Sequence, residues 1–144
     1  ATDDELARAS RAACATGIYR ATIELPGLTS TALARLLECL CELDRDYLHD
    51  PPRTPRLYEA GIRYAPELER GVERWLTIPR VIAHGKADCK SLACWRVEEL
   101  RARGVAARPA VTLRTTAEGC LYHVSVLLPD GNHDDPSRRL GMKG

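Results

Sequence analysis

A cysteine, a histidine and a pair of aspartates stand in the chain order that a thiol nucleophile would need. Cys89 lies in GKADCKSLACW, His123 lies in LYHVSV, and Asp134 and Asp135 lie in HDDPS. A thiol nucleophile requires a base that takes its proton, and the base requires a partner that orients it. These residue types in this order therefore indicate acyl-transfer chemistry on an amide.

Cys89 is expected at the first turn of a helix. Asp88 is a favourable N-cap residue, and a helical pattern continues to about residue 103, before Gly104, which suits a left-handed C-cap. Free amides and the positive end of the helix dipole would stabilise a thiolate at this place. The cysteine shares the apolar face of the helix, so its sulfur should point at the seam with a sheet. A small buried apolar cysteine without a chemical role is the simpler alternative.

His123 is expected in the middle of a strand that spans residues 120–128, CLYHVSVLL. Alternation along the strand places its ring on the opposite face from Tyr122. The PDGN stretch that follows predicts a hairpin turn. A strict two-residue loop sets Asp134 on the face of His123, whereas a bulge or a wider loop sets Asp135 there. Spacing alone leaves both aspartates open as the partner of the imidazole.

The remaining pattern predicts an α+β fold, in which helices come first and an antiparallel sheet follows. The proline-rich stretch that precedes the second half is too irregular for one continuous element. We divide the chain into a helical N-terminal segment, residues 1–50, and a core, residues 51–144, within one compact domain. Expected helices span residues 3–15, 30–49, 67–83 (mostly helical) and 88–103, and expected strands span residues 105–115 and 120–128. Residues 133–137 form a third strand or its exit, and residues 18–24 form a strand or an extended connector.

Composition excludes several classes of function. The 144 residues suit a single domain, and the net charge of +1 offers no electrostatic argument for nucleic-acid binding. No apolar run approaches the roughly 20 residues of a membrane span, and the acidic, polar start is unlike a signal peptide. The six cysteines form no CxxC pair and the four histidines lack zinc spacing, so we expect no metal and no cofactor. Reduced thiols are typical of a cytoplasmic setting.

Two further residues are candidates for lining the site. The backbone N–H of Cys89 is the first expected donor to an oxyanion, because a helix start leaves its amides free. His84, the nearest polar side chain upstream, is a candidate for the second donor. Alternatively, it is a loop histidine without a role. Trp75 either walls the site or packs in the core.

The stretches GKADCKSLACWRVEELRARGVAARP, YHVSV and DDPS resemble the transglutaminase-like branch of the papain-like cysteine peptidase superfamily. The resemblance covers about residues 80–137, less than half of the chain, and rests on the order of three motifs. The flanking LYEAGIRY, IPRVIAHG and RRLGM are similar to small transglutaminase-like proteins common in tailed-phage genomes. This resemblance implies a papain-like core, in which the helix that carries the cysteine packs on a small antiparallel sheet.

Carried over by position, the resemblance makes Cys89 the nucleophile, His123 the general base and then acid, and Asp135 the residue that orients the imidazole. It implies an amide of a peptide or protein as substrate, with water or an amine as acyl acceptor. The motif departs from the family where Lys90 replaces an acidic residue and Ala87 replaces a glycine. Lys90 would lower the thiol pKa or alter the choice of substrate.

Two alternatives to an enzyme accompany the resemblance. Phage-like relatives point to a virion or assembly protein that keeps the fold in a structural role, with phage structural proteins as partners and with the host cytoplasm or the virion as location. The other alternative is a redox-sensing pair of Cys89 and Cys94. These two residues are five positions apart on a helix, so their side chains point in different directions.

Overall fold

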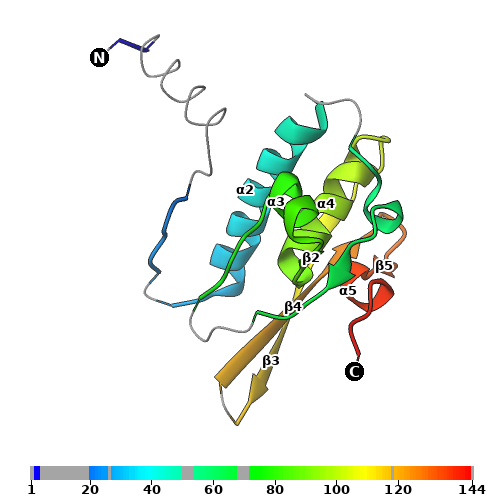
Figure 1. Ribbon diagram of the computed structural model, residues 1–144. Coiled ribbons are helices and arrows are strands. Elements are labelled where there is room, and N and C mark those ends of the chain that lie inside the picture. Colours follow the sequence, from blue (N-terminus) through cyan, green and yellow to red (C-terminus); the bar gives the residue numbers. More distant parts are fainter. Residues whose placement is uncertain are drawn as a thin grey trace.

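The computed structural model describes residues 2–3, 20–25, 27–49, 54–67, 72–117 and 119–143 (Figure 1). The helix expected over residues 3–15 falls outside these residues, except at its first position. Residues 20–25 have no regular secondary structure and are exposed, which favours the connector over the strand.

The fold is α+β with a small antiparallel sheet, which confirms the predicted class. Three strands run in the order β3-β4-β5, and a separate pair of two-residue strands, β1 and β2, runs parallel. Among the described residues, no helix is long and apolar enough to cross a membrane. The elements are α2 (Ser30–His49), η1 (Leu57–Glu59), β1 (Arg63–Tyr64), α3 (Ile78–His84), β2 (Lys86–Ala87), α4 (Cys89–Arg101), β3 (Arg108–Thr116), β4 (Gly119–Leu127), β5 (His133–Asp134) and α5 (Pro136–Arg139).

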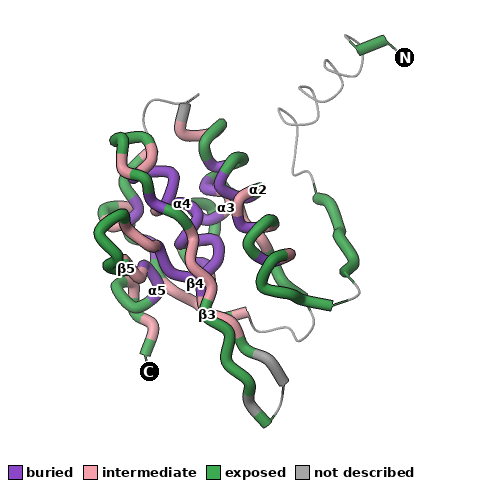
Figure 2. The backbone as a smooth tube through the Cα atoms, turned by 180° about the vertical axis from the view of Figure 1, so that it is seen from behind, coloured by how far each residue is buried: buried purple, intermediate pink, exposed green. Residues whose placement is uncertain are grey.

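Helix α4 lies at the centre of the molecule, with α2 on one side and the sheet on another (Figures 1 and 2). Its apolar face packs against one face of α2 and against the inner face of β4. Each fully buried side chain of this kind stabilises the fold by about 1.5–3 kcal/mol relative to an exposed one. The largest buried cluster consists of Leu33, Leu37, Leu40, Cys41, Ala93, Cys94, Val97, Leu100, Ala107, Val124 and Val126. Helix α2 therefore shares its core with the part of the chain that carries Cys89.

The other side of α4 is covered by η1, α3 and the short parallel strands. A second cluster fills this space, with Leu57, Ile62, Ile78, Val81, Ala87, Leu92 and Trp95. Because α4 is enclosed on both sides, its charged residues are also buried and need partners. Glu98 is one example, since it accepts hydrogen bonds from Arg45 and Arg101.

The helix expected over residues 67–83 is shorter than predicted. The structure places α3 at Ile78–His84, leaves residues 72–77 without regular secondary structure and does not describe residues 68–71. Pro79 lies in the first turn, where a missing N–H costs nothing, so it favours the start of a helix at this point. Pro136 acts in the same way on the third strand, which ends at Asp134 and gives way to α5.

Candidate functional site

Helix α4 begins at Cys89, as expected. Asp88 occupies the N-cap position with an extended backbone, and the first intrahelical hydrogen bond runs from Leu92 N–H to the Asp88 carbonyl, at 3.2 Å. The Asp88 side chain caps no backbone amide, however, contrary to the expectation from its residue type. Its carboxylate binds the Lys90 ammonium instead. The first amides of α4, including that of Cys89, therefore keep the free N–H groups of a helix start.

Lys90 is fully buried directly beside Cys89, although charged residues are rarely buried without partners. Its ammonium contacts Asp88, lies 2.8 Å from Glu73 Oε2 and 3.9 Å from Glu67 Oε1, and faces the Trp75 ring at 5.8 Å from the centroid. Burial lowers the pKa of Lys90, but the carboxylates outweigh burial and raise it, so the side chain is a cation at neutral pH. Its charge is thus already matched by acids.

The Cys89 thiol is half-buried against the edge of β4. Burial and the Asp88 carboxylate raise the pKa of Cys89 to about 11, while the backbone N–H of Val124 and the Lys90 ammonium oppose the rise. The thiol is therefore protonated at neutral pH. The expected thiolate at the helix start was wrong for this resting state, because desolvation and the neighbouring carboxylate outweigh the helix start and Lys90.

We expect an Asp88→Asn variant to label faster with iodoacetamide at Cys89. The substitution removes the larger of the two carboxylate effects on the thiol, so its pKa should fall from about 11 toward the ordinary value. The pH dependence of labelling, followed by mass spectrometry, measures that pKa. A Cys39→Ser background removes an exposed competing thiol. An unchanged labelling midpoint would show that Asp88 does not hold the proton on Cys89.

The loop between β4 and β5 decides which aspartate meets His123. Leu128 N–H donates to the Asn132 carbonyl at 2.9 Å, which leaves residues 129–131 as a three-residue loop. Gly131 has a φ of +89°, the left-handed conformation that such a loop needs and that glycine adopts at no steric cost. The wider loop shifts the register by one residue relative to a two-residue turn. Asp134 therefore pairs with Val126 and points to the α4 side of the sheet.

His123 and Asp135 meet on the outer face of the sheet. His123 Nε2 lies 2.8 Å from Asp135 Oδ2, and the two side chains are 25% and 20% exposed, so solvent reaches both. A carboxylate only accepts hydrogen bonds, so Nε2 carries the hydrogen and Nδ1 carries a lone pair that can take a proton. Asp135 is itself held as the N-cap of α5, where it accepts from Arg138 N–H, and Arg138 Nε lies 3.4 Å from the same Oδ2.

Asp134 has a different set of partners. Its carboxylate accepts from Tyr58 Oη and, at 2.8 Å, from Arg96 Nε of α4. The guanidinium groups of Arg96 and Arg139 both lie over the Tyr58 ring. Asp134 thus ties β5 to α4 and η1, and the structure brings Asp135, not Asp134, to the imidazole.

Cys89 lies against the stretch of β4 that contains His123. The Cys89 sulfur interacts with the amide of Val124, the residue directly after His123. Strand β5 pairs with β4 at Val126 and Leu127, beyond this stretch, so the strand edge is open to the helix start. Within the described residues, no hydrogen bond joins the thiol to the imidazole. In resting enzymes such catalytic hydrogen bonds are often long and tighten only when substrate is bound.

The other two candidates lie in different places. Trp75 packs against the same cluster as Cys89, and its ring faces the ammonium of Lys90, the residue that follows Cys89. His84 is exposed on α3, where its ring faces Arg80 at 3.1 Å. The structure gives His84 no contact with Cys89.

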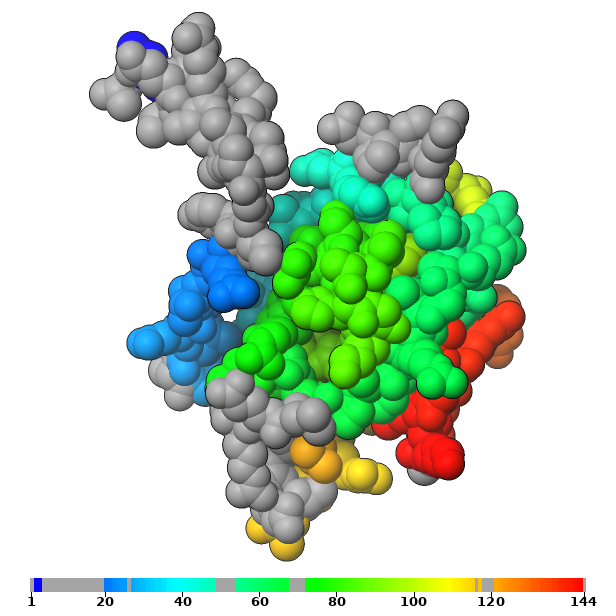
Figure 3. Space-filling view, in the orientation of Figure 1, coloured from blue at the N-terminus to red at the C-terminus, as the bar shows by residue number. Residues whose placement is uncertain are grey.

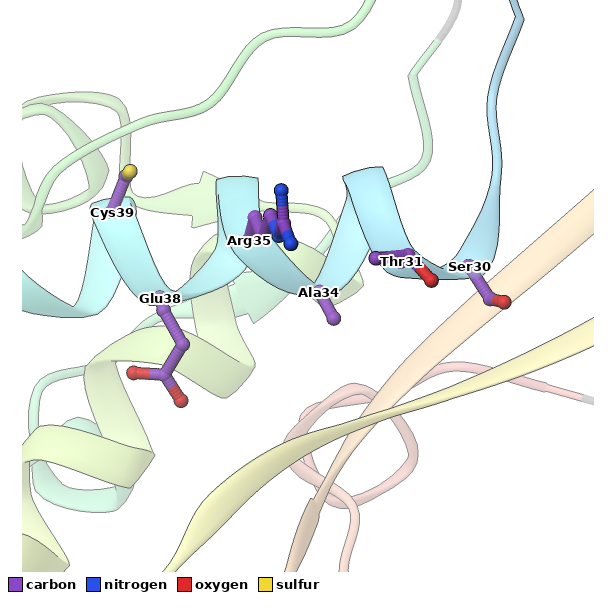
Figure 4. Close-up of a pocket in the computed structure, with 6 residues that line it drawn as sticks. All are labelled: Ser30, Thr31, Ala34, Arg35, Glu38 and Cys39. Carbon is purple, nitrogen blue, oxygen red and sulfur yellow. The ribbon is translucent and has the colours of Figure 1, made fainter.

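Two hollows open elsewhere on the surface. One, of about 640 Å³, lies along the exposed side of α2 and is lined by Ser30, Thr31, Ala34, Arg35, Glu38 and Cys39 (Figure 4). The other, of about 230 Å³, lies beside Arg45 and Glu98. Neither includes Cys89, His123 or Asp135 in its lining. Among the described residues, no group of three or more His, Cys, Asp or Glu side chains is placed to hold a metal ion.

Sequence reasoning did not find two residues of this region, Glu73 and Tyr122. Tyr122 Oη donates to Glu73 Oε2 at 2.6 Å, and the same carboxylate binds Lys90. The alternation of β4 placed Tyr122 on the inner face with Val124, which was the available signal. Glu73 lies in an irregular segment, where no periodicity reports what a side chain faces.

Comparison of the chain with protein-family models, with curated proteins and with solved structures found no significant match.

Proposed function

We propose that this protein is a cysteine-dependent amide hydrolase or acyl transferase that uses Cys89, His123 and Asp135. The observation that carries the proposal is the 2.8 Å contact of His123 Nε2 with Asp135, which leaves the Nδ1 lone pair to act as a base. His123 directly precedes Val124, whose backbone amide the thiol faces. The resemblance of the three motifs to transglutaminase-like peptidases supports the same roles. The substrate class is an amide of a peptide or protein.

In the proposed reaction, His123 Nδ1 takes the thiol proton as the sulfur attacks the amide carbon. The Cys89 amide at the helix start donates to the oxyanion, and Asp135 stabilises the imidazolium. The imidazolium then protonates the departing amine, the carbon–nitrogen bond breaks and a thioester remains. Water, deprotonated by His123, attacks the thioester and releases the acid and the thiol. An amine in place of water yields a new amide.

A raised thiol pKa is compatible with this sequence of steps. The serine of a Ser-His-Asp triad rests as a neutral group and is activated when its base removes the proton during attack, and a protonated thiol can be activated in the same way. Proton transfer and attack are then coupled, so the resting site needs no preformed thiolate. The reaction does require that the imidazole and the thiol come into hydrogen-bond distance when substrate is bound.

The test is the acylation of Cys89 by p-nitrophenyl acetate. We expect release of p-nitrophenol, an acetyl group on Cys89 detected by mass spectrometry, and slow hydrolysis of that thioester. Added methylamine separates the two outcomes, because an acyl transferase forms N-methylacetamide. The matched control is Cys39, an exposed thiol on α2 that should be acetylated without turnover. Equal behaviour of the two thiols would contradict the proposal.

A second candidate is an assembly or interaction protein that keeps the fold without turnover. The burial of Cys89 and the rise of its pKa to about 11 favour it, because an inert thiol has these properties. Here Lys90 and its acids would serve only to stabilise the start of α4. An intact fold with no acetylation of Cys89 above the level of an unfolded thiol would favour this candidate.

A further inference from the structure

The segment directly before α3 crosses the start of α4. We call residues 72–77 the strap; it has no regular secondary structure and leads into α3 beside α2 (Figure 1). The residue that follows it is fixed to the core, because Ile78 N–H donates to the buried Asp44 carboxylate at 3.0 Å. In the space-filling view, α3 and the segment before it lie in the middle of the visible face of the molecule (Figure 3).

Side chains fasten the strap on both sides of Cys89. Glu73 accepts from Tyr122 Oη of β4 at 2.6 Å and pairs with Lys90 of α4 at 2.8 Å. Leu76 N–H donates to the Ser91 hydroxyl at 3.1 Å. The contacts therefore span from β4 to α4, which are the two elements that present the imidazole and the thiol.

The strap lies close to the thiol. Trp75 packs against the same apolar cluster as Cys89 and Tyr122, and it covers the buried Lys90. Together with burial and Asp88, the Glu73 carboxylate is close enough to raise the pKa of the thiol. Glu73 bridges Tyr122 of β4 and Lys90, the neighbour of Cys89, so its contacts span the gap between the strand and the start of α4.

We propose that the strap is a closed lid over the proposed catalytic thiol, that the bond of Glu73 with Tyr122 and Lys90 is its latch, and that an extended acyl substrate enters by displacing it. The inference rests on the proposed function for its biological meaning. The latch is suited to opening, because the Glu73 side chain is 48% exposed and water can replace its partners. Regular secondary structure does not have to unfold for the strap to leave.

The test measures how fast iodoacetamide labels Cys89 in a Cys39→Ser background, with Tyr122→Phe as the main variant. This substitution removes the latch hydrogen bond and changes no carboxylate or ammonium, so faster labelling reports opening instead of altered charge. We expect an increase of about three- to tenfold, which is the value of one ordinary intramolecular hydrogen bond, because the Glu73 side chain is half exposed. Glu73→Gln should increase labelling further, because it also lowers the negative charge near the thiol. Glu42→Gln, on the exposed side of α2, is the matched control.

Urea distinguishes opening of the strap from unfolding of the whole protein. Labelling through a local opening changes little at low urea, whereas labelling through global unfolding rises steeply with it. We expect the shallow dependence, and a steep one would overturn the lid. Unchanged labelling in both latch variants would also overturn it. These outcomes are separate from the proposed function, because thiol labelling needs no turnover. Faster labelling of Cys89 in the latch variants, without hydrolysis of its acetyl group in the wild-type protein, would support the lid and contradict the proposed enzymatic activity.

Discussion

A His123→Ala variant is expected to hydrolyse the acetyl group on Cys89 about 100- to 10,000-fold more slowly than the wild-type protein. The physical reason is that the methyl group offers no lone pair at the position of Nδ1. Neither the thiol nor the attacking water then has a positioned base. Stopped assays of p-nitrophenol release, normalised to correctly folded protein, measure the loss.

The chain offers a matched control for this variant. His133 lies on the same outer face of the sheet, and its Nδ1 contacts a side chain, Ser125 Oγ, at 2.9 Å. His133→Ala removes a similar exposed ring but no proposed base, so turnover should be unchanged. A similar loss in both variants would mean that the sheet, and not the imidazole of His123, is responsible.

The two aspartates should separate in the same assay. Asp135→Asn weakens the carboxylate that accepts the hydrogen bond of His123, so turnover should fall. Asp134→Asn weakens the contacts to Tyr58 and Arg96, so it should lower the stability and leave the turnover of folded protein nearly intact. The reverse result would assign the orienting role to Asp134.

Local patterns were sufficient to predict the elements on both sides of the site. The start of α4 at Cys89 and the strand around His123 followed from an N-cap residue and from alternation, which are properties of neighbouring residues. The pairing of His123 with an aspartate depended on the width of one loop. Both registers suited the PDGN stretch, and the three-residue loop with Gly131 in the left-handed conformation selects Asp135.

The environment of Cys89 could not be predicted from the sequence. The pKa of the thiol depends first on how deeply the start of α4 is buried, and also on Glu73, which is sixteen positions away. Lys90 was expected to lower the thiol pKa, and it does oppose the rise, but the acids around it cancel much of its charge. Such sums of distant contacts have no periodicity and leave no local signal.

A Lys90→Met variant is expected to lose about 3–5 kcal/mol of the free energy of unfolding, because it leaves carboxylates at the start of α4 without their cation. Methionine matches the length of the side chain, so packing is largely kept. Urea denaturation measures the loss. Lys86→Met, at an exposed position in β2, is the matched control and should change little.

Asp88 gives this loss a characteristic pH dependence. Burial already raises the pKa of Asp88, and the two effects of Lys90 that lower it disappear in the variant, so its pKa in the folded state rises further above the unfolded value of about 3.9. An acid with a raised folded-state pKa contributes its full stability below the unfolded pKa and loses it as pH rises toward the folded pKa. Lys90→Met should therefore match the double variant Lys90→Met with Asp88→Asn near pH 4 and be less stable at pH 7. Equal stability of the two at every pH would show that Asp88 is not the group that Lys90 compensates.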